Sequence, residues 1–525
     1  MRDTKNGKQR PSGLSASSAE KEKDKRQKRV IYFYIALFSL ASSLSIITSF
    51  NPERIAGAFL LTMLLLAVFY RDMARYKPKF LSVRKNLLLL GILMAGTLLF
   101  SRLSLFMLLG MSKGYGLPAA SVVYAIPLAS GAMLAMLLFD SHTSIMFSFI
   151  ISLLAGIWLR DSAYPVFAFI GSLTAAFSVI RCKKRTEILK GGAALLAVNV
   201  VTVLFLMLLS GRFFTLRTGY AVLFAAVGAV AVTAVVSLAL PVLEYLFGVN
   251  TDISLLELLN LEHPLMKTMM IAAPGTYHHS IIVGNLVEAA AEDVGVNPLL
   301  ARVSAYYHDI GKIKMPEYFV ENQAGGASKH ERLTPHMSSM ILISHVKEGT
   351  ELARQYKLPE AVADIIQQHH GNSLINYFYQ KAKEKAEDLN EEEYKYPGPA
   401  PQSKVAALVM MADAVEASSR VLSDPTPARI SNLVNKIINH IFLDGQLDNC
   451  ELTLKDIQKV KQRFIYILTG ILHKRIDYPG FDFNREAGGE DAGPDNQLPK
   501  TDIAGRQADK ERLAPATRLV RFPKG

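Results

Sequence analysis

The sequence predicts an all-α protein in which a polytopic membrane helix bundle precedes a cytoplasmic all-helical domain. Two observations support this prediction. Half of the 525 residues are hydrophobic whereas only 20% are charged, and the apolar residues concentrate before Val249 as long runs broken by short polar links. After Val249 the apolar residues instead recur with the spacing of amphipathic helices. This composition excludes a disordered chain and a collagen-like fibre.

The apolar runs have the length of membrane spans. A bilayer core about 30 Å thick requires about 20 apolar residues per helix. Eight runs approach this length, at residues 30–50, 55–70, 87–109, 119–139, 143–159, 164–180, 192–210 and 219–248. We therefore expect an N-terminal transmembrane anchor at 30–50 and a bundle of seven transmembrane helices at 53–248.

The links between the runs predict the orientation. Lys and Arg gather in segments 21–29, 71–86 and 181–191, which lie on one side if all eight runs span the bilayer. The opposite links hold only Arg54, Lys113, Arg160, Arg212 and Arg217. Cytoplasmic links carry the excess of Lys and Arg, so both termini are expected in the cytoplasm. Orientation and anionic lipids then account for much of the net charge of +12, and no nucleic-acid polymer is needed as a partner.

The two ends of the chain predict loose tails. Residues 1–29 are polar and lack apolar periodicity, which indicates a disordered basic cytoplasmic tail. Residues 484–525 are rich in Gly, Pro, Asp, Lys and Arg and are also expected to be disordered. Two distant cysteines, Cys182 and Cys450, indicate neither a disulfide framework nor a thiolate zinc site.

Residues 249–483 predict a second, soluble helical domain. Heptad-like apolar spacing predicts helices over 280–294, 298–307, 335–346, 359–369, 402–420, 428–442 and 454–473. Gly and Pro interrupt the chain between them. No convincing run alternates in the manner of a β-strand.

A set of histidines and aspartates stands out at the ends of these helices. In order it comprises His278 and His279, His308 and Asp309, His345, His369 and His370, and Asp413. Asp413 lies in an apolar stretch, where an unpaired carboxylate would be costly to bury, and this favours contact with a cation. Imidazole and carboxylate ligands suit Fe, Mn or Zn. A carboxylate can bridge two ions, and two ions about 3.5–4 Å apart suit phosphodiester hydrolysis.

Several motifs carry a family resemblance. They are Pro274-Gly275-Thr276-Tyr277-His278-His279-Ser280, Tyr306-Tyr307-His308-Asp309-Ile310-Gly311-Lys312, Glu321-Asn322-Gln323 and Tyr396-Pro397-Gly398-Pro399. With the ordered histidines and aspartates they resemble the HD-domain metal phosphohydrolases. They are most similar to the seven-transmembrane-helix HD hydrolases, the bacterial cyclic di-AMP phosphodiesterases. The resemblance covers roughly residues 53–480.

The resemblance implies roles for individual residues. His279, His308, Asp309 and Asp413 would hold one ion, His345 and His369 a second, and Asp309 would bridge the two. His370 would be a ligand or a substrate contact, and ranks below His369. Lys312 lies one turn beyond the His-Asp pair, where its ammonium could meet a phosphate oxygen. His308, Asp309 and Lys312 are therefore the expected catalytic residues.

The resemblance also implies a reaction and a location. Two divalent transition metal ions, Mn or Fe, would activate a hydroxide that hydrolyses cyclic di-AMP to linear pApA. The protein would lower second-messenger levels from the bacterial inner membrane, with the HD domain in the cytoplasm. Members usually carry a large extracellular domain after the first span, whereas here that interval is about residues 51–54. Whether the chain forms a homodimer is left open.

Two other functions compete with this interpretation. A cyclic di-GMP phosphodiesterase of the same fold is disfavoured, since its Gly-Tyr-Pro signature is missing near the second-metal ligand. A non-catalytic nucleotide-binding membrane receptor would not need the complete set of metal-binding carboxylates.

For some polar residues a structural role is the alternative to a functional one. His278, His330 and His336 are expected to be structural, with His330 also a candidate for the site entrance. Arg102, inside a predicted span, is either functional or a side chain that extends to the membrane surface.

Overall fold

The computed structural model describes residues 13–47, 51–77, 84–323, 328–384 and 389–472. Over these ranges the chain is helical without a β-strand, and one isolated bridge joins Leu374 and Lys395. The predicted all-α fold is thereby confirmed. The predicted C-terminal tail at 484–525 and the last residues of the helical domain lie outside the described residues.

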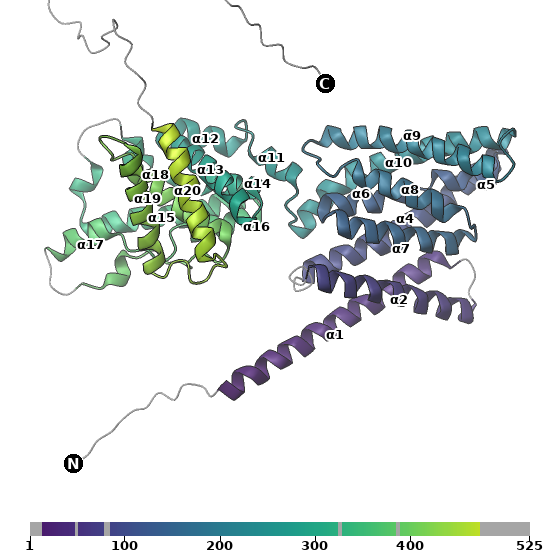
Figure 1. Ribbon diagram of the computed structural model, residues 1–525, viewed down its shortest axis with the longest axis horizontal. Coiled ribbons are helices and arrows are strands. Elements are labelled where there is room, and N and C mark those ends of the chain that lie inside the picture. Colours follow the sequence, from purple (N-terminus) through teal and green to yellow (C-terminus); the bar gives the residue numbers. More distant parts are fainter. Residues whose placement is uncertain (1–12, 48–50, 78–83, 324–327, 385–388, 473–525) are drawn as a thin grey trace, which may run out of the picture. The chain divides into compact units, whose positions relative to one another are not determined.

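The first half of the chain forms the membrane helices (Figure 1). Within the described ranges, seven helices are long and apolar enough to cross a bilayer, by length and composition. The chain is a multi-pass membrane protein. The helices are α1 (Gly13–Ile46), α2 (Pro52–Tyr76), α4 (Arg84–Tyr115), α5 (Ala119–Val122), η1 (Val123–Ala125), α6 (Ala129–Leu138), α7 (Ser141–Leu159), α8 (Tyr164–Phe177), α9 (Arg185–Leu209) and α10 (Leu216–Phe247).

Two membrane elements differ from the sequence prediction. Helix α1 begins at Gly13, whereas the sequence predicted a disordered tail over residues 1–29. This stretch is rich in Lys, Glu, Ala and Arg, which have high helix propensity and prolong the helix of the apolar run. Helix α8 has only 14 residues, about 21 Å at 1.5 Å per residue. It is therefore shorter than the run predicted at 164–180.

Small side chains allow the membrane helices to approach closely. A Cβ atom on Gly192 of α9 would lie 2.0 Å from Thr233 Oγ1 of α10. A Cβ atom on Gly228 of α10 would lie 2.6 Å from the backbone oxygen of Tyr124. Helix association in lipid depends on such close packing, because burial from water does not drive it.

Arg102 has a structural role in α4. Its guanidinium donates to the backbone oxygens of Leu44 at 2.6 Å and Ser45 at 3.2 Å. These carbonyls belong to the last turn of α1, where no further helical N–H group is available to them. Arg102 thus completes the C-terminal end of α1.

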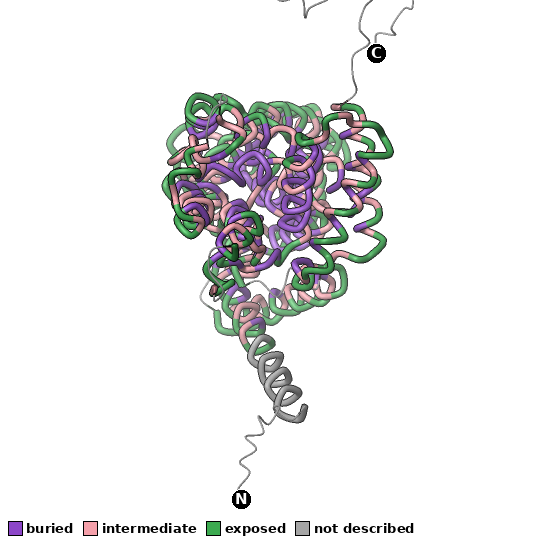
Figure 2. The backbone as a smooth tube through the Cα atoms, turned by 90° about the vertical axis from the view of Figure 1, so that its left-hand side faces the viewer, coloured by how far each residue is buried: buried purple, intermediate pink, exposed green. Residues whose placement is uncertain are grey.

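The second half forms a helical domain around two apolar cores. Its longer helices confirm those predicted from apolar spacing, whereas the short α11, α12 and α17 were not predicted. Figure 2 colours the described residues by burial, with buried segments in purple and exposed segments in green. The elements are α11 (Asp252–Leu258), α12 (Pro264–Ala272), α13 (Pro274–Val294), α14 (Pro298–Tyr307), η2 (Ile310–Lys314), η3 (Pro316–Tyr318), η4 (Val320–Asn322), η5 (Lys329–Arg332), α15 (Pro335–Gln355), α16 (Glu360–Gln368), α17 (Asn376–Lys383), η6 (Glu391–Tyr394), α18 (Lys404–Ser419), α19 (Pro427–Leu443) and α20 (Leu454–Ile471).

Candidate metal centre

Most of the predicted ligands lie directly after the ends of helices, and these helix ends lie close together. The Asn297 side chain caps α14, which ends at Tyr307 directly before His308 and Asp309. Helix α16 ends at Gln368, directly before His369 and His370. The remaining ligands project from within α13, α15 and α18. The structure thus brings together all seven residues that the sequence singled out as ligands, in two groups that share Asp309.

The first group comprises His279, His308, Asp309 and Asp413. His279 Nε2 lies 3.0 Å from Asp413 Oδ1 and 3.7 Å from Asp309 Oδ2. His308 Nε2 lies 3.2 Å from Asp309 Oδ2 and 3.8 Å from Asp413 Oδ1. Two imidazole nitrogens and two carboxylate oxygens therefore face one point.

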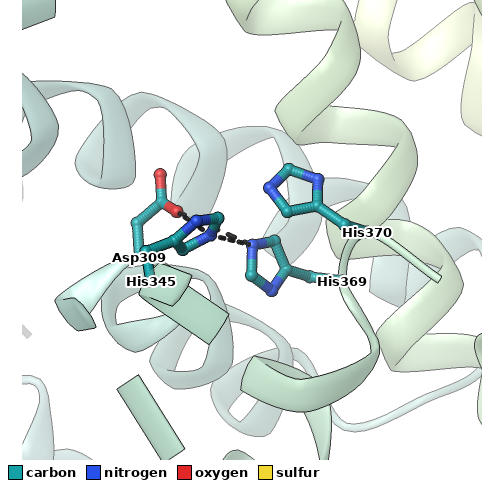
Figure 3. Close-up of side chains that lie close together, drawn as sticks. All are labelled: Asp309, His345, His369 and His370. Carbon is teal, nitrogen blue, oxygen red and sulfur yellow. Dashed lines mark hydrogen bonds and ion pairs between the residues drawn. The ribbon is translucent and has the colours of Figure 1, made fainter. Parts of the chain in front are cut away.

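The second group comprises Asp309, His345, His369 and His370 (Figure 3). Asp309 Oδ1 lies 3.4 Å from His345 Nε2 and 3.6 Å from His369 Nε2. These two nitrogens lie 3.3 Å apart. Asp309 therefore turns Oδ2 towards the first group and Oδ1 towards the second, as a carboxylate between two cations would.

Backbone carbonyls fix the rings of three histidines. The Nδ1 atoms of His308 and His369 lie 2.7 Å from the oxygens of Ala305 and Ile366, respectively. His345 Nδ1 bonds to the backbone oxygen of residue 342 in the same way. Each ring donates through Nδ1 to the residue three positions earlier, which leaves Nε2 free as a ligand.

Glu416 fixes the ring of His279 as the backbone carbonyls fix the other three. This role of Glu416 was not predicted from the sequence. Its Oε2 accepts a hydrogen bond from His279 Nδ1, while its Oε1 lies 2.7 Å from Arg420 Nη2. Glu416 lies three residues after Asp413 in α18 and is 2% exposed. The sequence contains one indication of this role, because Glu416 is a second acidic residue on the same face of an apolar helix as Asp413.

Burial and charge set the protonation of the site. Burial lowers the pKa of His345 to about 3, so its ring is neutral and can act as a ligand. Burial would raise the pKa of Asp309, but His308 and Lys312 hold it well below its ordinary value. For His308, burial is outweighed by Asp309 and Asp413, which raise its pKa to about 10. A cation that binds His308 Nε2 must therefore displace a proton.

The donor set fits divalent transition metal ions. His308 and Asp309 are fully buried, and His308 Nε2 has no hydrogen-bond partner among the described residues. A buried imidazole nitrogen that faces two carboxylates without a well-formed hydrogen bond is suited to share a cation with them. Nitrogen and carboxylate ligands suit Mn, Fe or Zn better than Ca or Mg.

Lys312 is held at the edge of this centre. Its Nζ lies 2.7 Å from Asp309 Oδ2 and 2.9 Å from Glu321 Oε1. Glu321 also accepts from Thr276 Oγ1 at 3.1 Å. The sequence placed Lys312 near a substrate phosphate, and the structure adds that two carboxylates hold its ammonium.

Three further histidines of this domain lie outside the two ligand groups. His278 is exposed although His279 is buried. His336 is also exposed, with its Nδ1 atom 3.6 Å from Glu393. His330 lies 2.8 Å from the backbone oxygen of Tyr318 and lines the cavity beside the metal ligands.

The cavity opens over the second group and has a volume of about 1150 Å³. His345, His369, His370 and Asp413 lie in its wall. The Tyr396 ring stacks on His370 with ring centres 4.2 Å apart. Pockets of about 300–1,000 Å³ accommodate drug-sized ligands, so a dinucleotide has room here.

Fold and site define the class, a multi-pass membrane protein with an HD-type hydrolase domain. The family described as "7TM receptor with intracellular HD hydrolase" matches residues 52–251, and "HD domain" matches residues 276–418. The chain belongs to this family of seven-transmembrane HD hydrolases.

Two curated relatives and one solved structure are similar to this chain. The cyclic-di-AMP phosphodiesterase PgpH of Bacillus subtilis is 40% identical over 367 residues, which are 68% of this chain and 52% of that protein. PgpH of Listeria monocytogenes is 38% identical over 364 residues, 69% of this chain and 51% of that protein. The chain therefore spans about half the length of these curated relatives. A crystal structure of the L. monocytogenes PgpH HD domain in complex with cyclic di-AMP is 47% identical, with a TM-score of 0.39, and covers 41% of this chain and 100% of that one.

Proposed function

We propose that this protein is an integral-membrane phosphodiesterase that hydrolyses cyclic di-AMP to linear pApA. The observation that carries the proposal is Asp309, whose two oxygens face two separate groups of histidine ligands beside a large cavity. The names of the two curated relatives support the choice of substrate.

Two divalent transition metal ions, Mn or Fe, are the proposed cofactors. His279, His308, Asp309 and Asp413 would hold one ion, and Asp309, His345 and His369 the other. When bound, such ions polarise phosphate oxygens and lower the pKa of water. His370 belongs to the second group by distance, but its side chain is 23% exposed whereas that of His369 is fully buried. We therefore assign His370 to the substrate side.

The residues of the chain would prepare the reaction in three ways. The carbonyl-bound histidine rings are fixed before substrate arrives, so little reorganisation is needed. Lys312, held by Glu321, presents an ammonium at the cavity wall that can stabilise negative charge on a phosphate oxygen. The Tyr396 and His370 rings offer a flat surface on which a base can stack.

The proposed orientation places this site in the cytoplasm, at the inner membrane of a bacterium. The basic links at 71–86 and 181–191 would face the cytoplasm together with the helical domain. A cytoplasmic site would have direct access to a second messenger.

The test is product analysis with full-length protein purified in detergent and supplied with Mn²⁺ or Fe²⁺. We expect conversion of cyclic di-AMP to pApA, detected by chromatography. Asp309→Ala should reduce turnover by about a hundredfold or more, because it removes the ligand shared by both ions. The matched control is His278→Ala, at an exposed position beside His279. Undiminished turnover by Asp309→Ala would contradict the two-ion site.

The same preparation separates the alternatives. Faster hydrolysis of cyclic di-GMP in a parallel assay would favour the other cyclic dinucleotide. Binding of cyclic di-AMP without any product, from a protein that retains its metal, would favour a receptor.

A further inference from the structure

The cavity extends well beyond the metal ligands. From His345 and His369 it reaches helix α19, where Lys436, Ile437 and His440 form part of its wall. Lys436 and His440 are four residues apart and both are exposed, so they lie on one face of α19. Neither residue is predicted to have a role from the sequence, since no motif connects α19 with the histidine and aspartate set.

The charges along the wall distinguish two lysines. Lys312 and Lys436 are the lysines that line the cavity. Lys312 is already engaged by Asp309 and Glu321. Lys436 has no ion pair or hydrogen bond among the described side chains, so its ammonium is available to a ligand. The nearby acid on this wall, Asp444, accepts a hydrogen bond from Gln446 at 2.9 Å.

A cyclic dinucleotide carries two phosphodiester groups, each with one negative charge. The paired ligand groups around Asp309 can receive only the phosphodiester that is cleaved. The second one must lie elsewhere in the cavity, and a cation opposite it would stabilise binding through a charge-assisted hydrogen bond.

We propose that Lys436 and His440 bind the second, uncleaved phosphodiester and thereby select cyclic dinucleotides over substrates with a single phosphodiester. This proposal rests on the proposed function. Lys436 supplies a full positive charge, and His440 adds a ring N–H donor one turn further along α19. Selection arises because a substrate with one phosphate leaves this cationic wall without a partner.

The experiment compares two substrates in the full-length protein purified in detergent. One is cyclic di-AMP, and the other is bis(p-nitrophenyl) phosphate, which has a single phosphodiester. The measured quantity is the ratio of their kcat/KM values. For Lys436→Gln we expect this ratio to fall about tenfold, through a higher KM for cyclic di-AMP, because a charge-assisted hydrogen bond is lost. His440→Gln should lower the ratio by a smaller factor, and Lys436→Arg should restore most of it.

The matched control is Lys347→Gln. Lys347 is an exposed lysine on α15 that does not line the cavity, and this change should leave the ratio as it is in the unaltered protein. A ratio that stays the same in Lys436→Gln, while the unaltered protein hydrolyses cyclic di-AMP, would overturn this proposal alone. Failure of the unaltered protein to hydrolyse cyclic di-AMP, with normal metal content, would overturn both this proposal and the proposed function.

Discussion

The imidazole rings of the metal centre are oriented by their own surroundings. His308, His345 and His369 each bond through Nδ1 to a carbonyl three residues earlier, which the helical turn supplies without any further side chain. His279 lies in α13, and its Nδ1 bonds to a side chain and not to a backbone carbonyl. It depends instead on Glu416, which Arg420 holds from the other side.

Glu416→Gln tests this dependence. An amide accepts a weaker hydrogen bond than a carboxylate and makes His279 a poorer ligand, so we expect affinity for Mn²⁺ to fall about 10–100-fold. Calorimetric titration of the metal-stripped full-length protein measures the change directly.

Glu351→Gln provides the comparison, since Glu351 is exposed on α15 and does not belong to the metal centre. Equal Mn²⁺ affinity in the Glu416 and Glu351 variants would show that His279 needs no carboxylate.

At the scale of elements, η2 and α15 meet at a contact that only glycine permits. A Cβ atom on Gly311 would lie 1.8 Å from the His345 backbone oxygen and 2.6 Å from the Gly349 backbone nitrogen. These are atoms of the α15 backbone, which cannot rotate away as a side chain can. The contact holds His308 and Asp309, just before η2, close to His345 on α15.

Gly311→Ala should therefore destabilise the helical domain by about 1–3 kcal/mol, the usual cost of overpacking, or more. Thermal unfolding of the purified protein measures this as a lower Tm. Gly470→Ala in α20 is the matched control, because a Cβ atom at that position would have no heavy atom within 4 Å. Alanine should stabilise that exposed helical position by up to about 1 kcal/mol. A Tm for Gly311→Ala equal to that of the unaltered protein would mean that α15 can move aside.

At the scale of the whole molecule, orientation depends on every membrane segment crossing the bilayer. Helix α8 is the short one, with 14 residues, and it packs against α6, α7 and α9. A short helix can still cross where the bilayer thins or where flanking residues reach the surface. If α8 crosses, its two flanking links lie on opposite sides.

Cysteine labelling in intact cells tests this arrangement. Ser162 precedes α8 and Thr186 follows it, and both are exposed. A membrane-impermeant maleimide should label Ser162→Cys from outside, whereas Thr186→Cys should react only after the cells are opened. The unaltered protein, with Cys182 and Cys450, gives the background. Labelling of both variants from outside would show that α8 does not cross and would contradict the predicted orientation.

The sequence by itself determined the helical class, which follows from the length of the apolar runs and the 3.6-residue period. It also predicted a division near Val249 and, from the cost of burying Asp413 unpaired, a cation contact. The full ligand set was implied by the family resemblance. Composition gives two opposing indications at residues 13–29, because the stretch is polar and also high in helix propensity, and helix α1 begins at Gly13.

The tertiary structure supplied the geometry of the two groups around Asp309, a division that the sequence only implied through its family resemblance. His279 and Asp413 are separated by 134 residues, yet they lie 3.0 Å apart. It also decided that Glu416 supports His279, that two carboxylates hold Lys312 and that α19 lines the cavity. Such contacts depend on how α13, α14, α15 and α18 pack, and the periodicity of one helix fixes which face is buried but not which distant side chain it meets.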